Sequence, residues 1–187
     1  MTKLVLIRHA RVTVDPRLPA DQWRLSAQGI EAASALCRDP AVAEVSPFYT
    51  SSEPKALATA LATSGRQAVV QVPDLRELDR SAVGWLDTAA EYAALVEELF
   101  RHPDEPVRGC EPATVAQRRI VHAIDTLVAA HHGRTLAVVS HGIVLALYMC
   151  HVKRLARLDP AIWRSIGFPD LAVVDPVQRA VIVDFRG

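Results

Sequence analysis

The chain lacks several features that would place it in other classes of protein. Its three cysteines (Cys37, Cys110 and Cys150) are far apart and form no C-x-x-C pair, which argues against a disulfide framework or a zinc site. Basic and acidic residues number 21 each, so net charge favours neither nucleic acid nor a membrane surface as a partner. The most apolar stretch, residues 136–150, contains His141 and is too short to span a bilayer.

The signatures of several enzyme classes are also missing. The sequence contains no G-x-G-x-x-G, no Walker A loop, no H-E-x-x-H and no G-x-S-x-G, so dinucleotide, nucleoside triphosphate, zinc protease and serine hydrolase chemistry lack their motifs. The first residues run directly into a strand pattern, which leaves no room for a signal peptide. We therefore expect a cytoplasmic protein with no metal, no cofactor, no nucleic-acid partner and no membrane association.

The remaining pattern predicts an α/β fold. With 187 residues, half of them hydrophobic, the chain can form one domain with a sizeable core, and we expect a single domain over residues 1–187. Short apolar runs alternate with helical patterns, which favours a mostly parallel central sheet covered on both faces and closed by a C-terminal hairpin. The predicted strands cover residues 3–7, 45–49, 68–72, 135–139, 171–174 and 180–185. The predicted helices cover residues 25–39, 54–63, 89–101, 114–131 and 142–150. In the first of these helices, the apolar face is expected to consist of Ile30, Ala33, Leu36 and Cys37.

Two of the predicted strands end in a histidine. Arg8 and His9 follow the apolar run of residues 4–7, and His141 follows that of residues 136–139. In open α/β sheets, ligands bind beyond the carboxyl ends of the strands, so these side chains indicate a pocket for an anion such as phosphate. Neutral imidazole is a nucleophile near neutral pH, and a planar guanidinium can neutralise phosphoryl oxygens in bidentate fashion.

Five blocks of sequence resemble the histidine phosphatase superfamily, in its phosphoglycerate-mutase-like branch. The family's R-H-G motif reads R-H-A at residues 8–10, and its L-T-x-x-G-x-x-Q-A segment reads LSAQGIEAA at residues 25–33. Its S-x-x-x-R-A-x-x-T-A block reads SSEPKALATA at residues 51–60, and its L-x-E block reads LRE at residues 75–77. Its second histidine motif, S-H-G, stands at residues 140–142. The blocks occur in the family's order and span most of the chain, which makes the resemblance specific.

The resemblance implies a three-layer α/β/α sandwich and a role for each matching residue. His9 would be the phosphorylated nucleophile, and Arg8 and His141 would bind the transferring phosphoryl group and stabilise its charge. Glu77 would protonate the leaving oxygen and then activate water. Lys55 would take the position of a phosphate-binding arginine.

The chain departs from the family pattern at several positions near the expected phosphate. Gly142 matches the glycine of the second histidine motif, and we group it with the expected substrate-binding residues. Ala10 replaces the glycine that follows the first histidine in the family, and Val12 stands where threonine is usual. Asp15 stands where an asparagine often contacts phosphate, and an aspartate there would repel phosphate unless it is protonated or turned away. Lys55 keeps a positive charge but lacks the bidentate fork of arginine.

The predicted function is metal-independent hydrolysis of a phosphomonoester through a phosphohistidine on His9, with a phosphorylated small molecule or a phosphoprotein as substrate. One alternative is a phosphoglycerate-mutase-type phosphotransferase, although the mutases of the family usually have longer chains. The other is a catalytically weakened member that binds a phosphorylated ligand, which Ala10, Asp15 and Lys55 motivate.

Some of these residues also have plain structural interpretations. Glu77 could equally be a solvated loop carboxylate, and Asp79 is a second candidate for the general acid. Lys55 could equally be an exposed helix lysine. The helix predicted over residues 89–101 and the loop after it lie where the family places a lid over the site.

Overall fold

The computed structural model describes residues 2–65 and 67–187. The strands are β1 (Lys3–Arg8), β2 (Val12–Thr13), β3 (Arg24–Leu25), β4 (Phe48–Thr50), β5 (Val69–Gln71), β6 (Thr135–Ser140), β7 (Asp170–Asp175) and β8 (Ala180–Val183). The helices are α1 (Ala27–Ala35), α2 (Pro40–Ala43), α3 (Pro54–Ser64), α4 (Ala89–Arg101), α5 (Ala113–Ala130), α6 (Gly142–Val152) and α7 (Pro160–Arg164).

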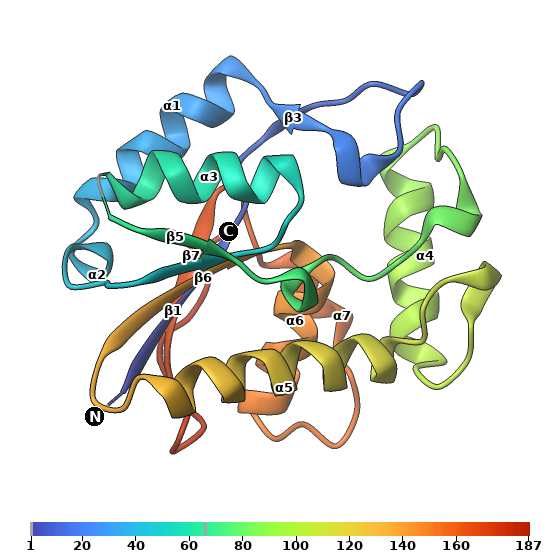
Figure 1. Ribbon diagram of the computed structural model, residues 1–187. Coiled ribbons are helices and arrows are strands. Elements are labelled where there is room, and N and C mark those ends of the chain that lie inside the picture. The colour runs from blue at the N-terminus through green and yellow to red at the C-terminus, as the bar shows by residue number, and fades with distance from the viewer. Residues whose placement is uncertain (1, 66) are drawn as a thin grey trace.

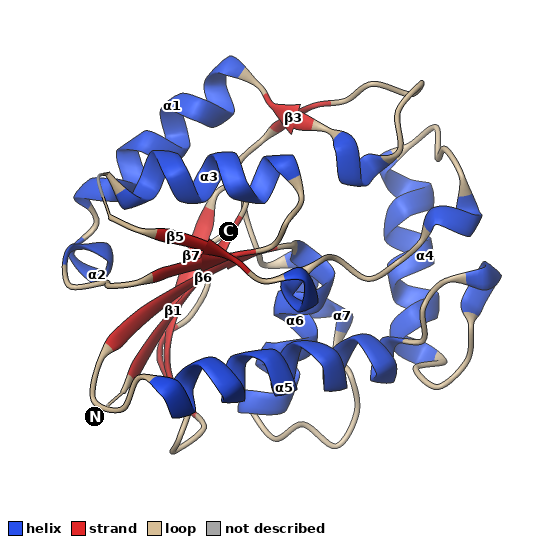
Figure 2. Cartoon of the chain, in the orientation of Figure 1, coloured by secondary structure: helices blue, strands red, loops and turns tan. Residues whose placement is uncertain are grey.

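A six-stranded sheet in the order β5-β4-β6-β1-β7-β8 forms the centre of the described residues (Figure 2). Strands β5, β4, β6 and β1 are parallel, whereas β7 pairs antiparallel with β1 and β8 antiparallel with β7. The prediction of a mostly parallel sheet with a C-terminal hairpin is therefore confirmed. Strands β2 and β3 form a separate two-stranded ribbon in the segment that follows His9.

Helices cover both faces of the sheet, as Figure 1 shows for α1 and α3 on one side and α5 and α6 on the other. The alternation of side chains along β1 explains this arrangement. Val5 and Ile7 pack in the cluster that includes residues of α3, while Leu4 and Leu6 pack in the larger cluster with α5 and α6. A strand buried on both faces needs a continuous apolar run, which is what residues 4–7 provide.

The buried face of the first helix differs from its prediction. Gly29 and Ala33 are the buried residues of α1, whereas Ile30 is 52% exposed and Cys37 is also exposed. The prediction that Ile30 and Cys37 belong to the buried face was wrong. Small side chains let α1 approach α3 closely, and the apolar periodicity of the segment did not reveal which face makes that approach.

Three other elements also differ from the sequence-based expectations. Strand β4 begins at Phe48 rather than residue 45, because Pro47 cannot donate a ladder hydrogen bond. The short helices α2 and α7 were not predicted. In each, an aspartate accepts a hydrogen bond from a backbone N–H two residues later and is followed by proline at the first helical position, so the Asp-Pro pairs at residues 39–40 and 159–160 are the local signals for these helices.

In the part of the chain that the structure describes, none of the helices combines the length and the apolar character needed to cross a membrane.

Candidate active site

The carboxyl ends of β1, β4 and β6 bring the two predicted histidines to the same edge of the sheet. Arg8 at the end of β1 is paired in register with Ser140 at the end of β6, so His9 and His141 follow neighbouring strands directly. Their ring centroids lie 5.2 Å apart with the ring planes tilted by 59°. The parallel register places the two rings beside each other although they are far apart in the sequence.

His9 is held in one tautomer. Its ring is buried, and Nδ1 lies 2.8 Å from the carbonyl oxygen of Ala10. Because a carbonyl oxygen can only accept, Nδ1 carries the proton and Nε2 keeps its lone pair. Burial lowers the pKa of His9 to about 3, with smaller contributions from the charges of Lys55 and Arg8, so the ring is neutral at physiological pH.

The alanine after His9 fits without distortion. Ala10 is fully buried and is not among the described residues with positive φ, so the backbone does not require the glycine of the family motif. Its N–H donates to Oγ1 of Thr59 on α3 at 3.0 Å. Further along, Gly29 of α1 packs on the backbone of Arg11, where a Cβ would lie 2.1 Å from the Arg11 carbonyl oxygen. The glycine of the second family block therefore supports the loop that follows His9.

Arg8 is buried and closely confined. Its Nη1 donates to the carbonyl of Ile166, and its Cζ lies 3.4 Å from the ring centroid of Phe168, a cation–π contact. On another side lies Gly142, where a Cβ would be only 2.8 Å from Nη2. Burial lowers the pKa of Arg8 to about 10, so the guanidinium stays charged at neutral pH. Its Nε is buried and has no hydrogen-bond partner among the described residues.

His141 is completely buried at the position before α6. Its Nε2 lies 2.7 Å from Oγ of Ser51 and 3.2 Å from Oε1 of Glu53. Its Nδ1 has no hydrogen-bond partner within the described residues. Burial holds the pKa of His141 well below its usual 6.5, and the neighbouring charges of Lys55 and Arg8 lower it further.

Glu77 is half-buried and binds the start of α6. Its Oε2 accepts the N–H of Ile143 at 3.1 Å, and its Oε1 accepts those of Val144 and Leu78 at 3.1 and 3.0 Å. Burial raises the pKa of Glu77 although these N–H groups oppose the shift, and a carboxyl that retains its proton more readily suits a general acid. The rival carboxylate of Asp79 is exposed and accepts the N–H of Ser81 instead.

Lys55 is buried rather than exposed. Its Nζ donates to the carbonyl of Ala20 at 2.6 Å and to Oε2 of Glu53 at 2.5 Å. The alternative interpretation of Lys55 as an exposed helix lysine is therefore wrong, whereas its predicted role in binding phosphate stays a prediction. Glu53 was missed by sequence reasoning, although its place two residues before Lys55, between the end of β4 and the start of α3, was an available signal.

Asp15 makes its side-chain contacts within its own loop. Its carboxylate forms an ion pair with Arg17 at 2.8 Å, and its carbonyl accepts the indole N–H of Trp23 at 3.0 Å. The arginine also holds the pKa of Asp15 below its usual value, so the carboxylate is charged. The structure thus shows the aspartate turned toward Arg17, and a phosphate contact through Asp15 stays a prediction.

Helix α4 contributes an aromatic residue that the sequence did not single out. Burial raises the pKa of Tyr92 to about 12, and the charge of Glu77 adds to that shift. Its ring packs edge-on against Trp163 of α7, with centroids 5.5 Å apart, and Arg80 lies 5.0 Å over the ring. Tyr92 therefore joins α4 to α7 through aromatic packing.

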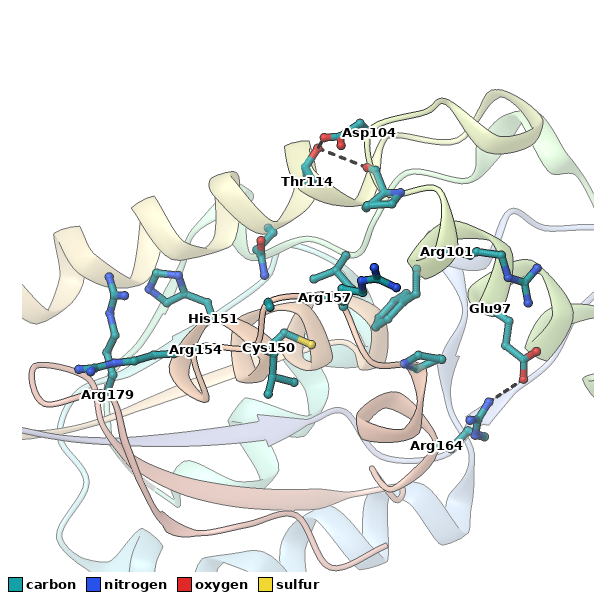
Figure 3. A pocket seen from close by; sticks show the side chains of 17 residues that line it. Glu97, Arg101, Asp104, Thr114, Cys150, His151, Arg154, Arg157, Arg164 and Arg179 are labelled. Atoms are coloured by element: carbon teal, nitrogen blue, oxygen red, sulfur yellow. Dashed lines mark hydrogen bonds and ion pairs between the residues drawn. The ribbon is translucent and has the colours of Figure 1, made fainter.

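A surface depression lies outside this group of residues. It has a volume of about 930 Å³ and is lined from α4, the start of α5, the end of α6 and the loop after it (Figure 3). It includes Cys150 and His151 near the carboxyl end of α6, whereas His141 precedes the amino end. Within the described residues, His, Cys, Asp and Glu side chains form no group of three or more that could hold a metal ion.

Comparison with known proteins points to one family. A family model described as histidine phosphatase superfamily (branch 1) matches residues 4–175. Among solved structures, the chain is similar to Bacillus stearothermophilus YhfR at 25% sequence identity, with a TM-score of 0.77 over 100% of this chain and 97% of that chain. Its fold is also similar to that of Entamoeba histolytica phosphoserine phosphatase in complex with 3-phosphoglyceric acid, at 17% identity and a TM-score of 0.77 over 100% and 98% of the two chains. Mycobacterial glucosyl-3-phosphoglycerate phosphatase is similar in fold at 20% identity, with a TM-score of 0.71 over 92% of each chain. No curated protein sequence matches the chain significantly.

Proposed function

Because this chain belongs to the histidine phosphatase superfamily, we propose that it hydrolyses phosphomonoesters through a phosphohistidine on Nε2 of His9, without a metal ion. The family and its phosphatase and mutase relatives support phosphoryl transfer through a histidine. The observation that carries the proposal is the state of His9, which is buried, neutral and protonated on Nδ1 by its contact with Ala10, with Nε2 unprotonated.

The first chemical step forms the phosphohistidine. The Nε2 lone pair of His9 forms a bond to phosphorus while the bond between phosphorus and the ester oxygen breaks. Glu77, whose pKa is raised by burial, gives its proton to the leaving oxygen. The bond between Nδ1–H and the Ala10 carbonyl persists and stabilises the positive charge that develops on the ring.

The second step returns the enzyme to its starting state. Glu77, now ionised, accepts a proton from a water molecule, whose oxygen forms a bond to phosphorus as the bond between phosphorus and nitrogen breaks. Inorganic phosphate leaves, and Glu77 and His9 recover their initial protonation.

Positive charge for the phosphoryl oxygens comes from the protein. Arg8 offers its unpartnered Nε and is held by Phe168 and Ile166, so little reorganisation is needed when an anion arrives. Lys55 has one N–H left after its bonds to Ala20 and Glu53. The bound ligand of one relative, 3-phosphoglyceric acid, supports a phosphorylated small molecule as the substrate class.

The test is phosphate release from p-nitrophenyl phosphate and a panel of phosphorylated metabolites, in the presence of a chelator, for the wild type and His9→Ala. Release that disappears in the variant, together with acid-labile labelling of His9 by a radioactive substrate, supports the proposal. Exchange of phosphoryl groups between two positions of one substrate, without net release, would indicate a mutase. Phosphate binding without turnover or labelling would indicate a binding protein.

A further inference from the structure

One carboxylate contacts both a histidine and a lysine of the candidate site. Glu53, whose side chain is 11% exposed, places Oε1 3.2 Å from Nε2 of His141 and Oε2 2.5 Å from Nζ of Lys55. Its Oε1 also accepts the backbone N–H of Glu77 at 2.8 Å. The proposed mechanism assigns no task to this carboxylate, although it touches Glu77 and Lys55, which the mechanism uses, and His141 beside them.

The contact with Glu53 selects one tautomer of His141. A carboxylate oxygen accepts hydrogen bonds, so the proton of the neutral ring lies on Nε2, where Glu53 and Ser51 share it. Ser51 is itself fixed, because its Oγ accepts the N–H of Glu53 at 3.1 Å. The other ring nitrogen, Nδ1, is buried and has no partner within residues 2–65 and 67–187. Nδ1 is therefore the nitrogen left for the phosphoryl group: it accepts a hydrogen bond from the P–OH of a phosphoryl monoanion, and it becomes a donor only if that proton moves from the oxygen to the ring.

The same carboxylate reduces the attraction of the candidate site for anions. Arg8 and Lys55 supply positive charge, but Oε2 of Glu53 lies against the ammonium of Lys55. With one further N–H bonded to Ala20, Lys55 has a single donor for phosphate. A negative group beside a phosphate site opposes the binding of phosphate in the ground state.

We infer that Glu53 is a positioning residue: it holds Nε2 of His141 and Nζ of Lys55 so that Nδ1 of His141 faces the phosphoryl group, and its charge keeps phosphate from binding tightly. The inference rests on the proposed function. A product that binds weakly leaves quickly, while an oriented His141 assists only when charge builds up in the transition state.

The test is the isosteric variant Glu53→Gln, compared with the wild type and with Glu98→Gln. Glu98 is an equally charged residue on α4 that pairs with Arg108 at 2.9 Å, so its variant controls for the change in net charge. Binding of inorganic phosphate is measured by calorimetry, and kcat and KM are measured on p-nitrophenyl phosphate. We expect Glu53→Gln to bind phosphate about tenfold more tightly and to lower kcat about tenfold, so that KM and kcat fall together. Glu98→Gln should match the wild type.

A merely structural role predicts the opposite shift in binding. If Glu53→Gln binds phosphate as weakly as the wild type or more weakly, the inference is overturned. Nitrogen-15 NMR of the histidines in the unaltered protein gives a second test that does not depend on the variant folding. His141 should carry its proton on Nε2, and a proton on Nδ1 in the phosphate-free protein would overturn the inference. If the wild type hydrolyses no ester, the proposed function fails. The calorimetry and the NMR would still test whether Glu53 weakens phosphate binding and fixes the tautomer of His141.

Discussion

Replacing Gly142 by alanine is expected to disable the site through Arg8. On the observed backbone, the new Cβ would lie 2.8 Å from Nη2, 2.9 Å from Cζ and 3.0 Å from Nε of the guanidinium. Favourable contacts between such atoms lie at about 3.5–4.0 Å, so the guanidinium must move by several tenths of an ångström or more. It has little room to do so, because Phe168 covers its other face and Ile166 accepts its Nη1 hydrogen bond.

The expected loss is larger in activity than in stability. Displacement of a phosphate-binding group by about 1 Å costs roughly 100-fold in kcat/KM, which corresponds to about 2.7 kcal/mol of transition-state stabilisation. Overpacking destabilises a fold by about 1–3 kcal/mol. Alanine offsets part of that cost, because it is favoured over glycine in helices by up to about 1 kcal/mol.

The assay is a double-mutant cycle. We would measure kcat/KM on p-nitrophenyl phosphate for the wild type, Gly142→Ala, Arg8→Ala and the double variant, with urea unfolding of each protein. Once the guanidinium is removed, the added methyl has open space, so Gly142→Ala should cost less than about threefold in the Arg8→Ala background. Losses that multiply independently would show that the methyl does not act through Arg8, and the steric argument would then be wrong.

Three further predictions concern the other site residues. Glu77→Gln should slow hydrolysis of esters with poor leaving groups by about 10²–10⁴-fold and affect p-nitrophenyl phosphate much less; equal loss on both substrates would contradict the acid role. Burial lowers the pKa of His9 from 6.5 to about 3, so at pH values between these two the unfolded chain binds more protons than the folded one. The free energy of unfolding should therefore fall as the pH drops from 6.5 toward 3. Urea titrations across this window should show a shallower fall for His9→Gln, and parallel curves would refute the assignment. Lys55→Arg should strengthen phosphate binding severalfold in calorimetry, because a guanidinium has donors to spare after Glu53 and Ala20 are satisfied; unchanged affinity would show that residue 55 does not reach the phosphate.

Much of the fold could be predicted because its signals are local. The helix predicted over residues 89–101 has those bounds in α4, and its start is fixed by a capping box between Thr88 and Glu91. The apolar runs that become β1 and β6 needed only their length and composition to be identified as buried strands. By contrast, the buried face of α1 was predicted incorrectly at Ile30, because the close approach to α3 depends on a partner helix that periodicity does not reveal.

By itself, the sequence determined that Arg8, His9 and His141 stand at strand ends, and its ordered motifs led to the family. Those features depend on neighbours along the chain, which a sequence displays directly. Only the tertiary structure decided that Nε2 of His9 is unprotonated, that Nδ1 of His141 has no partner in the described residues, and that Lys55 is buried against Glu53. These properties follow from single hydrogen bonds and from the exclusion of water, and both are set by side chains that the folded sheet and helices bring within 3 Å or so of each other.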